Sequence, residues 1–486
     1  MNKISCFLPY AGKEQVEKTV NSLQATGLIE EIRLITTDAT LESLPDCEIL
    51  FVDMPYSSAT LKAIANAAKG EYTLLYTKET TLEMGMFALE RMIHILEDSS
   101  AGMVYADHYQ IADGKQSNAP VIDYQFGSLR DDFNFGSLLL FNTEKLKEAA
   151  GHMKSDYNFA GLYDLRLKLS QHSDLVHINE YLYSEVENDT RKSGEKIFDY
   201  VDPKNRDRQI EMEQACTEHL KEIGGYLAPE FKKIEFSAGN FEYEASVIIP
   251  VRNRIRTIRD AIKSVLMQKT DFKYNLIIID NHSTDGTTEA IDEFKDDERL
   301  IHIVPERNDL GIGGCWNMGV HHPKCGKFAV QLDSDDVYAD ENTLATMVRA
   351  FYEQNCAMVV GTYMMTDFNM NMIAPGIIDH KEWTPANGRN NALRINGLGA
   401  PRAFYTPVLR EVKVPNTSYG EDYALGLNFS RQYQIGRVYD VVYLCRRWDD
   451  NSDASLDIVK MNGHNLYKDR IRTWELQARI AMNKNK

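Results

Sequence analysis

EASVIIPVRNRIRTIRDAIKSVLMQKTDFKYNLIIIDNHSTDGT, residues 244–287, contains two apolar runs separated by one amphipathic segment. The runs ASVIIPV and YNLIIID are short and rich in β-branched residues, which predicts two buried strands. The apolar residues between them recur at the spacing of one helical face: Ile258, Ala261, Ile262, Val265 and Leu266. A strand, a helix and a second strand in this order predict a βαβ unit with parallel strands.

The same alternation continues downstream. TTEAIDEF and GGCWNMGVHHP are typical of helices, and RLIHIVP and GKFAVQL are typical of strands. The last of these strands ends in the acidic run DSDD, Asp333 to Asp336. Alternating strands and helices predict an α/β fold with a mostly parallel sheet, and such sheets bind ligands at the carboxyl ends of their strands.

The first half of the chain repeats this plan in weaker form. ISCFLPYAGKEQVEKTVNSLQ is similar to SVIIPVRNRIRTIRDAIKSVLMQ, and KAIANAAKGEYTLLYTKETTL is similar to the segment that contains DSDD. This comparison pairs Asn66 with Asn317 and Asp164 with Asp422. The matching order of these landmarks predicts two tandem copies of one domain, whereas the alternative is a chance similarity between two α/β domains.

We expect three parts along the chain. Residues 1–194 form the first copy, residues 195–242 a helical connector, and residues 243–486 the second copy. The C-terminal segment NLYKDRIRTWELQARIAMNKNK predicts an amphipathic helix that packs against the second copy.

The composition limits the class of partner. A chain of 486 residues with 43% hydrophobic and 26% charged residues is globular and exceeds one hydrophobic core. The net charge of −18 disfavours nucleic acid or an anionic membrane as the main partner. No apolar run approaches the ~20 residues of a spanning helix, so we expect no transmembrane segment and leave peripheral membrane contact open.

The cysteines and the first residues predict a location. The seven cysteines are odd in number, scattered and without CxxC spacing, which favours reduced thiols over disulfides or a zinc site. MNKISCFLPYAGKEQ meets a proline and charges too early for a signal peptide. We therefore expect a cytoplasmic protein.

The acidic run DSDD is the strongest chemical signal. Carboxylates at the end of a buried strand are hard oxygen ligands that suit Mg²⁺ or Mn²⁺ shared with a diphosphate. Alone, such a quartet is more often a solvated turn. Three other strand ends in this half also carry polar groups or glycines: Pro250 to Arg254, Asp280 to Asp285, and Asn308 with Gly311, Gly313 and Gly314.

VIIPVRNR, LIIIDNHSTDGT, ERNDLGIGGCWNMG and LDSDD occur in the order and spacing of the family 2 glycosyltransferases, which the second half closely resembles. The first half resembles them weakly. The resemblance implies an α/β fold of two tandem GT-A-like domains, which is the Rossmann-like fold of nucleotide-diphospho-sugar transferases. It also implies an inverting, metal-assisted transfer of a hexosyl or N-acetylhexosaminyl group.

The resemblance assigns roles to individual residues. Asp335 matches the ligand of Mn²⁺ or Mg²⁺ in the DxD motif, and Asp333 matches the ribose contact. Asp280 matches a carboxylate that accepts a hydrogen bond from the base, which fits uracil and hence a UDP-sugar. The nucleotide-sugar site comprises Pro250, Arg252, Asn253, Asp280, Asn308, Gly313, Asn317, Asp333, Ser334 and Asp336. The structural alternatives are a tight turn for the glycines and a capping or exposed residue for Asn317.

A base for the acceptor hydroxyl is expected at GEDYAL. There the resemblance makes Asp422 the catalytic base and Glu421 a residue that orients the acceptor. The structural alternative is a pair of acids in the first turn of a helix.

One position departs from the family pattern. The family often has a metal-binding histidine after an arginine pair, and CRRWDDNS has Trp448 there. Asp449, Asp450 or water are the candidate replacements. Arg446 and Arg447 are candidates for binding the diphosphate or are ordinary surface residues.

The segment from His380 to Arg402 is expected on the acceptor side. Trp383 within it either stacks on a sugar ring or packs in the core.

The first copy has Lys78 and Glu79 where the acidic run is expected, which predicts a degenerate domain. Asp107 and Asp164 keep open a chain with two active transferase domains. A non-catalytic scaffold that binds sugar nucleotides or glycans is the second alternative. The partners expected on the main interpretation are a nucleotide-diphospho-sugar and a glycan or lipid-linked acceptor, as in polysaccharide biosynthesis.

Overall fold

The computed structural model describes residues 3–42, 44–186, 202–237, 239–448 and 456–485. The chain divides into two compact units. Unit 1 consists of Met1–Lys196, Asp207–Gly225 and Leu456–Thr473, and unit 2 consists of Ile197–Arg206, Tyr226–Ser455 and Trp474–Lys486.

Unit 1 is built on a nine-stranded sheet with the order β3-β2-β1-β4-β8-β6-β9-β5, and β7 pairs with β6. The strands are β1 (Ile4–Pro9), β2 (Ile29–Thr36), β3 (Glu48–Phe51), β4 (Tyr72–Tyr76), β5 (Leu82–Met84), β6 (Met103–Ala112), β7 (Lys115–Ala119), β8 (Leu138–Asn142) and β9 (Leu175–Val186). β3, β2, β1 and β4 are parallel neighbours, and β6 and β9 run in the same direction. β5, β7 and β8 run the opposite way.

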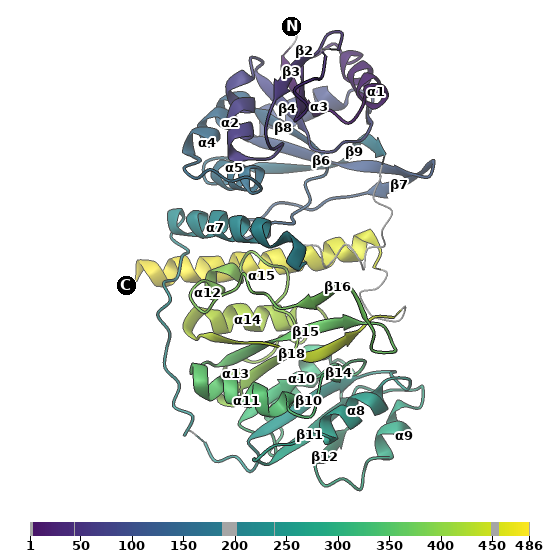
Figure 1. Ribbon diagram of the computed structural model, residues 1–486, viewed down its shortest axis with the longest axis vertical. Helices are drawn as coiled ribbons and strands as arrows, with labels where there is room; N and C mark the ends of the chain where they lie inside the picture. Colours follow the sequence, from purple (N-terminus) through teal and green to yellow (C-terminus); the bar gives the residue numbers. More distant parts are fainter. Residues whose placement is uncertain (1–2, 43, 187–201, 238, 449–455, 486) are drawn as a thin grey trace. The chain divides into compact units, whose positions relative to one another are not determined.

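Helices cover both faces of this sheet (Figure 1). α1 (Lys13–Gln24) and α3 (Ala88–Asp98) bury their apolar sides in one core. α2 (Ser58–Ala67), α4 (Thr143–His152) and α5 (Gly161–Ser170) form the core on the other face. The charged segment between the two copies forms the short 3₁₀ helix η2 (Pro203–Asn205) and α7 (Arg206–Glu222).

Unit 2 has a second nine-stranded sheet with the corresponding order β12-β11-β10-β13-β17-β15-β18-β14, and β16 pairs with β15. Its strands are β10 (Ala245–Val251), β11 (Tyr274–Asp280), β12 (Leu300–Ile303), β13 (Phe328–Gln331), β14 (Val337–Tyr338), β15 (Met358–Thr366), β16 (Met372–Ile378), β17 (Arg402–Tyr405) and β18 (Ile435–Arg446). Its helices are α8 (Ile258–Leu266), α9 (Thr287–Asp292), α10 (Ile312–His321), α11 (Thr343–Gln354), α12 (Gly388–Asn391), α13 (Thr406–Val412) and α14 (Glu421–Gln432). The predicted fold class, two tandem α/β domains with mostly parallel sheets, is confirmed.

The two copies share individual hydrogen bonds as well as topology. The Ser5 hydroxyl accepts a bond from the Gly70 amide at 2.8 Å, and Ser246 accepts one from Gly326 at 2.7 Å. These serines lie at the same position of β1 and β10. The matching contacts support an internal duplication.

Contacts of α5 and α14 correct the predicted pairing of Asp164 with Asp422. The Tyr163 hydroxyl donates to the Leu129 carbonyl, and the Tyr423 hydroxyl donates to the Ala392 carbonyl. In the same register Ser170 bonds Leu167 and Ser430 bonds Leu427. The residue before Tyr423 is Asp422, whereas the residue before Tyr163 is Leu162. Leu162 therefore occupies the position of Asp422 in unit 1.

The pairing of Asn66 with Asn317 is also wrong. α2 and α10 both have ten residues, and Asn66 is the ninth residue of α2 while Asn317 is the sixth of α10.

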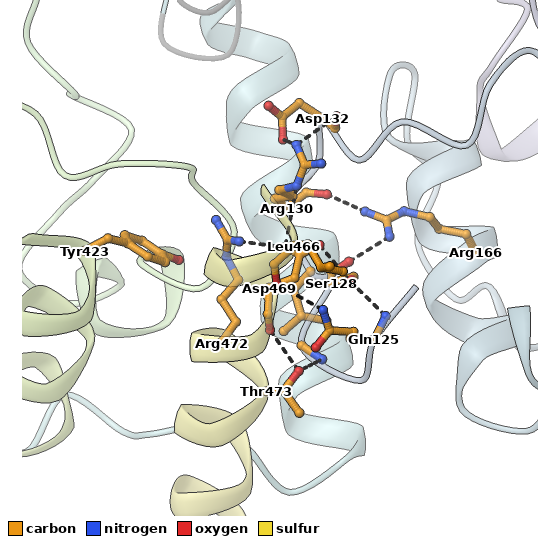
Figure 2. Close-up of polar contacts among 12 residues, drawn as sticks. Gln125, Ser128, Arg130, Asp132, Arg166, Tyr423, Leu466, Asp469, Arg472 and Thr473 are labelled. Atoms are coloured by element: carbon orange, nitrogen blue, oxygen red, sulfur yellow. Dashed lines mark hydrogen bonds and ion pairs between the residues drawn. The ribbon is translucent and has the colours of Figure 1, made fainter. Parts of the chain in front are cut away.

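The C-terminal helix α15 (Ile458–Lys484) differs from the expectation that it packs on the second copy alone, because its residues up to Thr473 belong to unit 1. Figure 2 shows the polar contacts that hold this part. The Ser128 hydroxyl donates to Asp469 at 2.9 Å, and the Gly127 amide donates to the Thr473 hydroxyl at 2.9 Å. Arg130 lies 3.5 Å from the same Asp469 carboxylate.

All seven cysteines are free thiols, and six of them are buried. Within the described residues no helix combines the length and the apolar character needed to cross a bilayer.

Candidate active site

The loops that follow the first strands of unit 2 are joined by hydrogen bonds. Asn253 Oδ1 accepts a bond from the Thr284 amide at 2.8 Å, and Asp285 Oδ2 accepts one from the Ile255 amide at 3.1 Å. Asn253 has a φ of 53°, in the left-handed region that asparagine tolerates better than most residues. Arg252 is exposed beside it, and Pro250 is partly buried at the end of β10. The β10 loop is therefore held in one conformation by the β11 loop.

Asp280 ends β11 with a fully buried carboxylate. One oxygen accepts from the Ser283 amide at 3.1 Å and the other from the Thr288 hydroxyl at 2.5 Å, while His302 lies 3.5 Å away. Burial alone would raise the pKa of Asp280, but the bonds from His302, Ser283 and Thr288 outweigh it and hold this pKa below its usual range. In this structure the carboxylate stabilises the loop that follows β11, and its contact with a nucleobase stays a prediction.

The glycines of α10 are required by packing. A Cβ at Gly313 would lie 1.8 Å from the Pro415 carbonyl oxygen, and one at Gly314 would lie 2.3 Å from Asn416 Oδ1. The helix start thus lies directly against residues 414–417. Packing within the chain thus accounts for these glycines, and the role of Gly313 in a nucleotide-sugar site stays a prediction.

Asn317 bonds this same segment. Its amide nitrogen donates to the Val414 carbonyl at 2.7 Å, and its amide oxygen accepts from the Val414 N–H at 3.0 Å. Asn308, by contrast, is exposed before the helix. Asn308 is thus the more accessible of the two predicted donor contacts.

The acidic run follows β13. Asp336 is buried and bonded inside the unit, whereas Asp335 lies partly exposed at the edge of the sheet. Asp336 is 5% exposed and accepts a bond from the Arg446 amide at 2.8 Å. Burial, and then the neighbouring Asp335 and Asp333, raise the pKa of Asp336 well above its usual value. Ser334 is buried as well. The Asp335 side chain is 16% exposed, with Arg254 Nε at 3.7 Å from its carboxylate.

A chain of contacts joins the acidic run to the predicted base. Gln331 donates to Asp333 Oδ1 at 2.9 Å and accepts from the Arg402 amide at 3.1 Å. The Arg402 guanidinium lies 3.0 Å from Asp422 Oδ2. Arg402 ends the segment expected on the acceptor side, whereas no role was predicted for Gln331. The position of Gln331 two residues before Asp333, on the same face of the strand, is the one signal for it in the sequence.

Glu421 and Asp422 begin α14, as predicted. The Tyr423 amide donates to Asp422 Oδ1 at 2.7 Å, and the Asp422 side chain remains 27% exposed. Burial, with a further contribution from the Asp422 charge, raises the pKa of Glu421 to about 8. Burial therefore favours the neutral form of Glu421 beside Asp422.

Trp448 belongs to an aromatic contact. The Arg256 guanidinium lies 4.4 Å from the Phe368 ring centroid and 5.1 Å from that of Trp448. Arg446 is fully buried, donates to the Asp335 carbonyl at 2.6 Å and pairs with Asp260 at 2.9 Å. Arg446 is thus neither a surface residue nor an exposed diphosphate ligand, and it fixes the backbone of the acidic run. Asp449 and Asp450 lie outside the described residues.

The segment from His380 to Arg402 contributes mainly to packing. Trp383 is fully buried with Arg437 over its ring, so it is not a platform for a sugar. Arg389 is buried and donates to four carbonyl groups. Arg402 is the residue of this segment that reaches the acids.

The residues present fit a divalent ion shared with a diphosphate. Among the described residues there is no group of three or more histidine, cysteine or acidic side chains arranged to hold a metal alone. Asp335 offers a carboxylate at the rim, and Mg²⁺ commonly binds one or two carboxylates together with substrate phosphates. One protein ligand is therefore sufficient for such an ion.

The same sheet edge of unit 1 carries other chemistry. By strand register Thr77 corresponds to Asp333 and Glu79 to Asp335. Lys78 forms an ion pair with the buried Glu185 at 2.5 Å. A lysine thus lies in the unit 1 equivalent of the acidic run.

The two acids that favoured an active first half are both buried, but their surroundings differ. Asp164 is fully buried, with Lys168 Nζ at 3.9 Å. Asp107 pairs with His177 at 2.8 Å and accepts a bond from the Val121 amide. Asp107 therefore has structural partners, whereas neither buried oxygen of Asp164 accepts a hydrogen bond from the described residues.

Comparison with known proteins gives consistent matches. Residues 246–403 match the family model described as Glycosyl transferase family 2. "Glycosyltransferase GlyG" of Streptococcus pneumoniae serotype 4 is 28% identical over 122 residues, which are 25% of this chain and 40% of that protein. The "GalNAc(5)-diNAcBac-PP-undecaprenol beta-1,3-glucosyltransferase" of Campylobacter jejuni is 36% identical over 93 residues, 19% of this chain and 29% of that protein.

Among solved structures, S. aureus TarS 1-349 in complex with UDP-GlcNAc aligns at 18% identity with a TM-score of 0.37. The alignment covers 49% of this chain and 72% of that one. The chain spans less than half the length of the two curated relatives named above.

Proposed function

Because the second half of the chain carries a family 2 glycosyltransferase domain at residues 246–403, we propose that unit 2 transfers a sugar from a nucleotide-diphospho-sugar to a hydroxyl acceptor. The observation that carries this proposal is the contact chain from Asp333 through Gln331 and Arg402 to Asp422. It joins the predicted donor contacts and the predicted base at one edge of the sheet. A transfer needs both groups at one site.

Asp422 is the base in this proposal. Its partly exposed carboxylate removes the proton of the acceptor hydroxyl as the oxygen attacks the anomeric carbon. The bond from that carbon to the diphosphate breaks on the opposite side, so the nucleoside diphosphate leaves and the configuration inverts. The Arg402 guanidinium, 3.0 Å from Asp422 Oδ2, holds this carboxylate in position.

Asp335 holds a divalent ion, Mn²⁺ or Mg²⁺, in the same proposal. When bound, this ion neutralises the charge that grows on the leaving diphosphate. The residues around Asp335 are positioned for this role because Arg446 bonds the Asp335 carbonyl and the Asp336 carboxylate. Asp335 therefore has a fixed backbone at the rim.

The donor and acceptor classes extend the proposal. We infer a UDP-sugar carrying a hexosyl or N-acetylhexosaminyl group, with a glycan or lipid-linked acceptor. Support for the lipid-linked class is the name of the Campylobacter jejuni relative, which specifies an undecaprenol-linked acceptor. We place the reaction in the cytoplasm, in agreement with seven free thiols.

Unit 1 is proposed as a non-catalytic copy. Leu162, at the position that corresponds to Asp422, cannot accept a proton. The Lys78 cation, in the unit 1 equivalent of the acidic run, would repel a metal ion. Two active domains in one chain are therefore disfavoured.

The test is release of nucleoside diphosphate. The purified chain is incubated with Mn²⁺ and a panel of UDP-, GDP- and dTDP-sugars, with Asp335→Ala and Asp422→Asn measured in parallel. We expect one class of donor to be cleaved by the parent and spared by both variants. Asp296→Asn, an exposed acid away from the rim, is the matched control and should keep parental activity.

Two results would count against the transferase. Release that persists in Asp335→Ala and Asp422→Asn would place the chemistry elsewhere. Neither release nor a nucleotide-dependent rise in melting temperature would favour the scaffold alternative.

A further inference from the structure

Unit 1 contains two adjoining cavities at the carboxyl edge of its parallel strands. One has a volume of about 290 Å³ and the other about 360 Å³. Both are lined by Met54 and Asn158, so they form one groove with two parts. We refer to these parts as the inner cavity and the outer cavity.

The inner cavity lies where unit 2 has its proposed acceptor side. Its wall includes Thr77, which corresponds to Asp333, and Leu162 and Tyr163, which correspond to Asp422 and Tyr423. The inner cavity of unit 1 thus corresponds in position to the proposed substrate site of unit 2.

One wall of the inner cavity is formed by Arg166, which packs against aromatic rings. The Arg166 guanidinium lies 4.6 Å from the Tyr163 ring centroid and 5.4 Å from that of Phe135. It donates to the carbonyls of Ser128 and Arg130, as Figure 2 shows. These hydrogen bonds and ring contacts fix the position of the Arg166 guanidinium in the cavity wall.

The rim of the groove presents exposed aromatic rings beside polar groups. Phe159 is 39% exposed at the inner cavity, and Phe51 is 51% exposed at the outer one. The side chains of Asn158, Asp53 and Asp156 also line the groove. Rings that cover the apolar face of a sugar, next to amide and carboxylate groups that bond its hydroxyls, are suited to binding carbohydrate.

We propose that this groove binds a neutral oligosaccharide without reacting with it, one sugar in each cavity. A neutral ligand fits because Asp53 would repel an acidic sugar in the outer cavity, where Asp156 is already paired with Lys62 at 3.6 Å. If unit 2 is the proposed transferase, this saccharide is its acceptor or its growing product. That identification rests on the proposed function. The binding itself does not depend on it.

The residues just before α5 are held in place by hydrogen bonds, which suits a groove that binds a ligand without reacting with it. Glu211 of α7 accepts bonds from the Asn158, Phe159 and Ala160 amides at 3.1, 2.6 and 3.1 Å. These bonds hold Asn158 and Phe159 at the junction of the two cavities. The groove is thus pre-organised, which reduces the entropy lost on binding.

The experiment uses the full chain with Asp335→Ala and Asp422→Asn, so that no turnover interferes. An array of defined neutral and acidic oligosaccharides is screened without donor or metal, and the best binder is titrated by calorimetry. We expect a neutral oligosaccharide to bind, and Phe159→Ala and Phe51→Ala each to weaken it tenfold or more. Phe126→Ala, 45% exposed in unit 1 and outside the groove, should leave the affinity unchanged.

A second measurement does not depend on these variants folding. The methyl group of Met54, labelled with ¹³C and assigned through Met54→Leu, should shift when the saccharide is added. Three results would overturn the proposal. No saccharide on the array binds, both phenylalanine variants keep the parental affinity, or a UDP-sugar changes the chemical shift of the Met54 methyl group. Because donor cleavage is measured separately, failure of the transferase function would leave these results readable.

Discussion

Replacing Gly313 by alanine tests the packing of α10 against the segment after α13. The added Cβ would lie 1.8 Å from the Pro415 carbonyl oxygen, far inside any ordinary contact. Both partners are backbone, so no side chain can turn away. The segment that contains Pro415 must therefore move relative to the helix.

The expected cost is the balance of three effects. Overpacking of this kind costs about 1 to 3 kcal/mol. Movement of the segment also weakens the two Asn317 bonds to Val414, each worth ~1 kcal/mol. Alanine restores about 1 kcal/mol of helix propensity. The net loss in the free energy of unfolding should be about 2 to 4 kcal/mol.

Tryptophan fluorescence isolates the affected unit, because Trp316, Trp383, Trp448 and Trp474 all belong to unit 2. In urea the Gly313→Ala midpoint should fall by about 1 M or more. Gly463→Ala is the matched control, since its Cβ meets open space in α15, and far-ultraviolet dichroism should show no loss of stability. An unchanged midpoint for Gly313→Ala would refute the packing role.

Three further predictions concern charge. The Asp280 carboxylate, 3.5 Å from His302 Nε2, raises the pKa of His302 above its ordinary 6.5. The stabilisation from this pair is therefore complete below pH 6.5 and is lost as the pH rises through the higher folded pKa. His302→Gln should flatten the fall in the melting temperature of unit 2 between about pH 6 and 8, and a slope equal to the parent's would contradict this. Burial raises the pKa of Glu421 from 4.5 to about 8, so stability falls as the pH rises through that interval. Glu421→Gln should therefore gain more in melting temperature over the parent at pH 8 than at pH 5, and equal gains would rule out a buried, protonated Glu421. Arg402→Ala removes the cation 3.0 Å from Asp422 and should slow nucleoside diphosphate release about tenfold or more, with the dichroism spectrum retained; parental activity would argue against a positioning role.

Local sequence pattern was sufficient for the strands that organise the site. Apolar runs ending in polar residues identified β10, β11 and β13, because a strand buried on both faces reads as a continuous run. The places of Asp280 and of the acidic run follow directly. The weaker pattern of the first half still indicated the duplication, which the shared sheet order supports.

Register within a helix could not be predicted in the same way. Asp164 was paired with Asp422 because acids were matched with acids. The structure sets the register by the hydroxyl bonds of Tyr163 and Tyr423 to distant carbonyl groups. Such contacts leave no pattern in a single sequence.

Burial of long polar side chains was the other source of error. Arg446 was a candidate for binding the diphosphate or a surface residue, yet it is buried and its charge is compensated by Asp260 and a carbonyl. The sequence left both a sugar contact and core packing open for Trp383, and its burial under Arg437 decides for packing. Tertiary partners decide burial at both positions.

The most direct test of the central claim compares the same change in each unit. Asp335→Ala and Glu79→Ala alter corresponding positions of the two sheets. Nucleoside diphosphate release from the preferred donor is measured with Mn²⁺ for both variants. Our account predicts that release is lost in Asp335→Ala and unchanged in Glu79→Ala. Loss in Glu79→Ala with activity kept in Asp335→Ala would place the active site in unit 1 and contradict it.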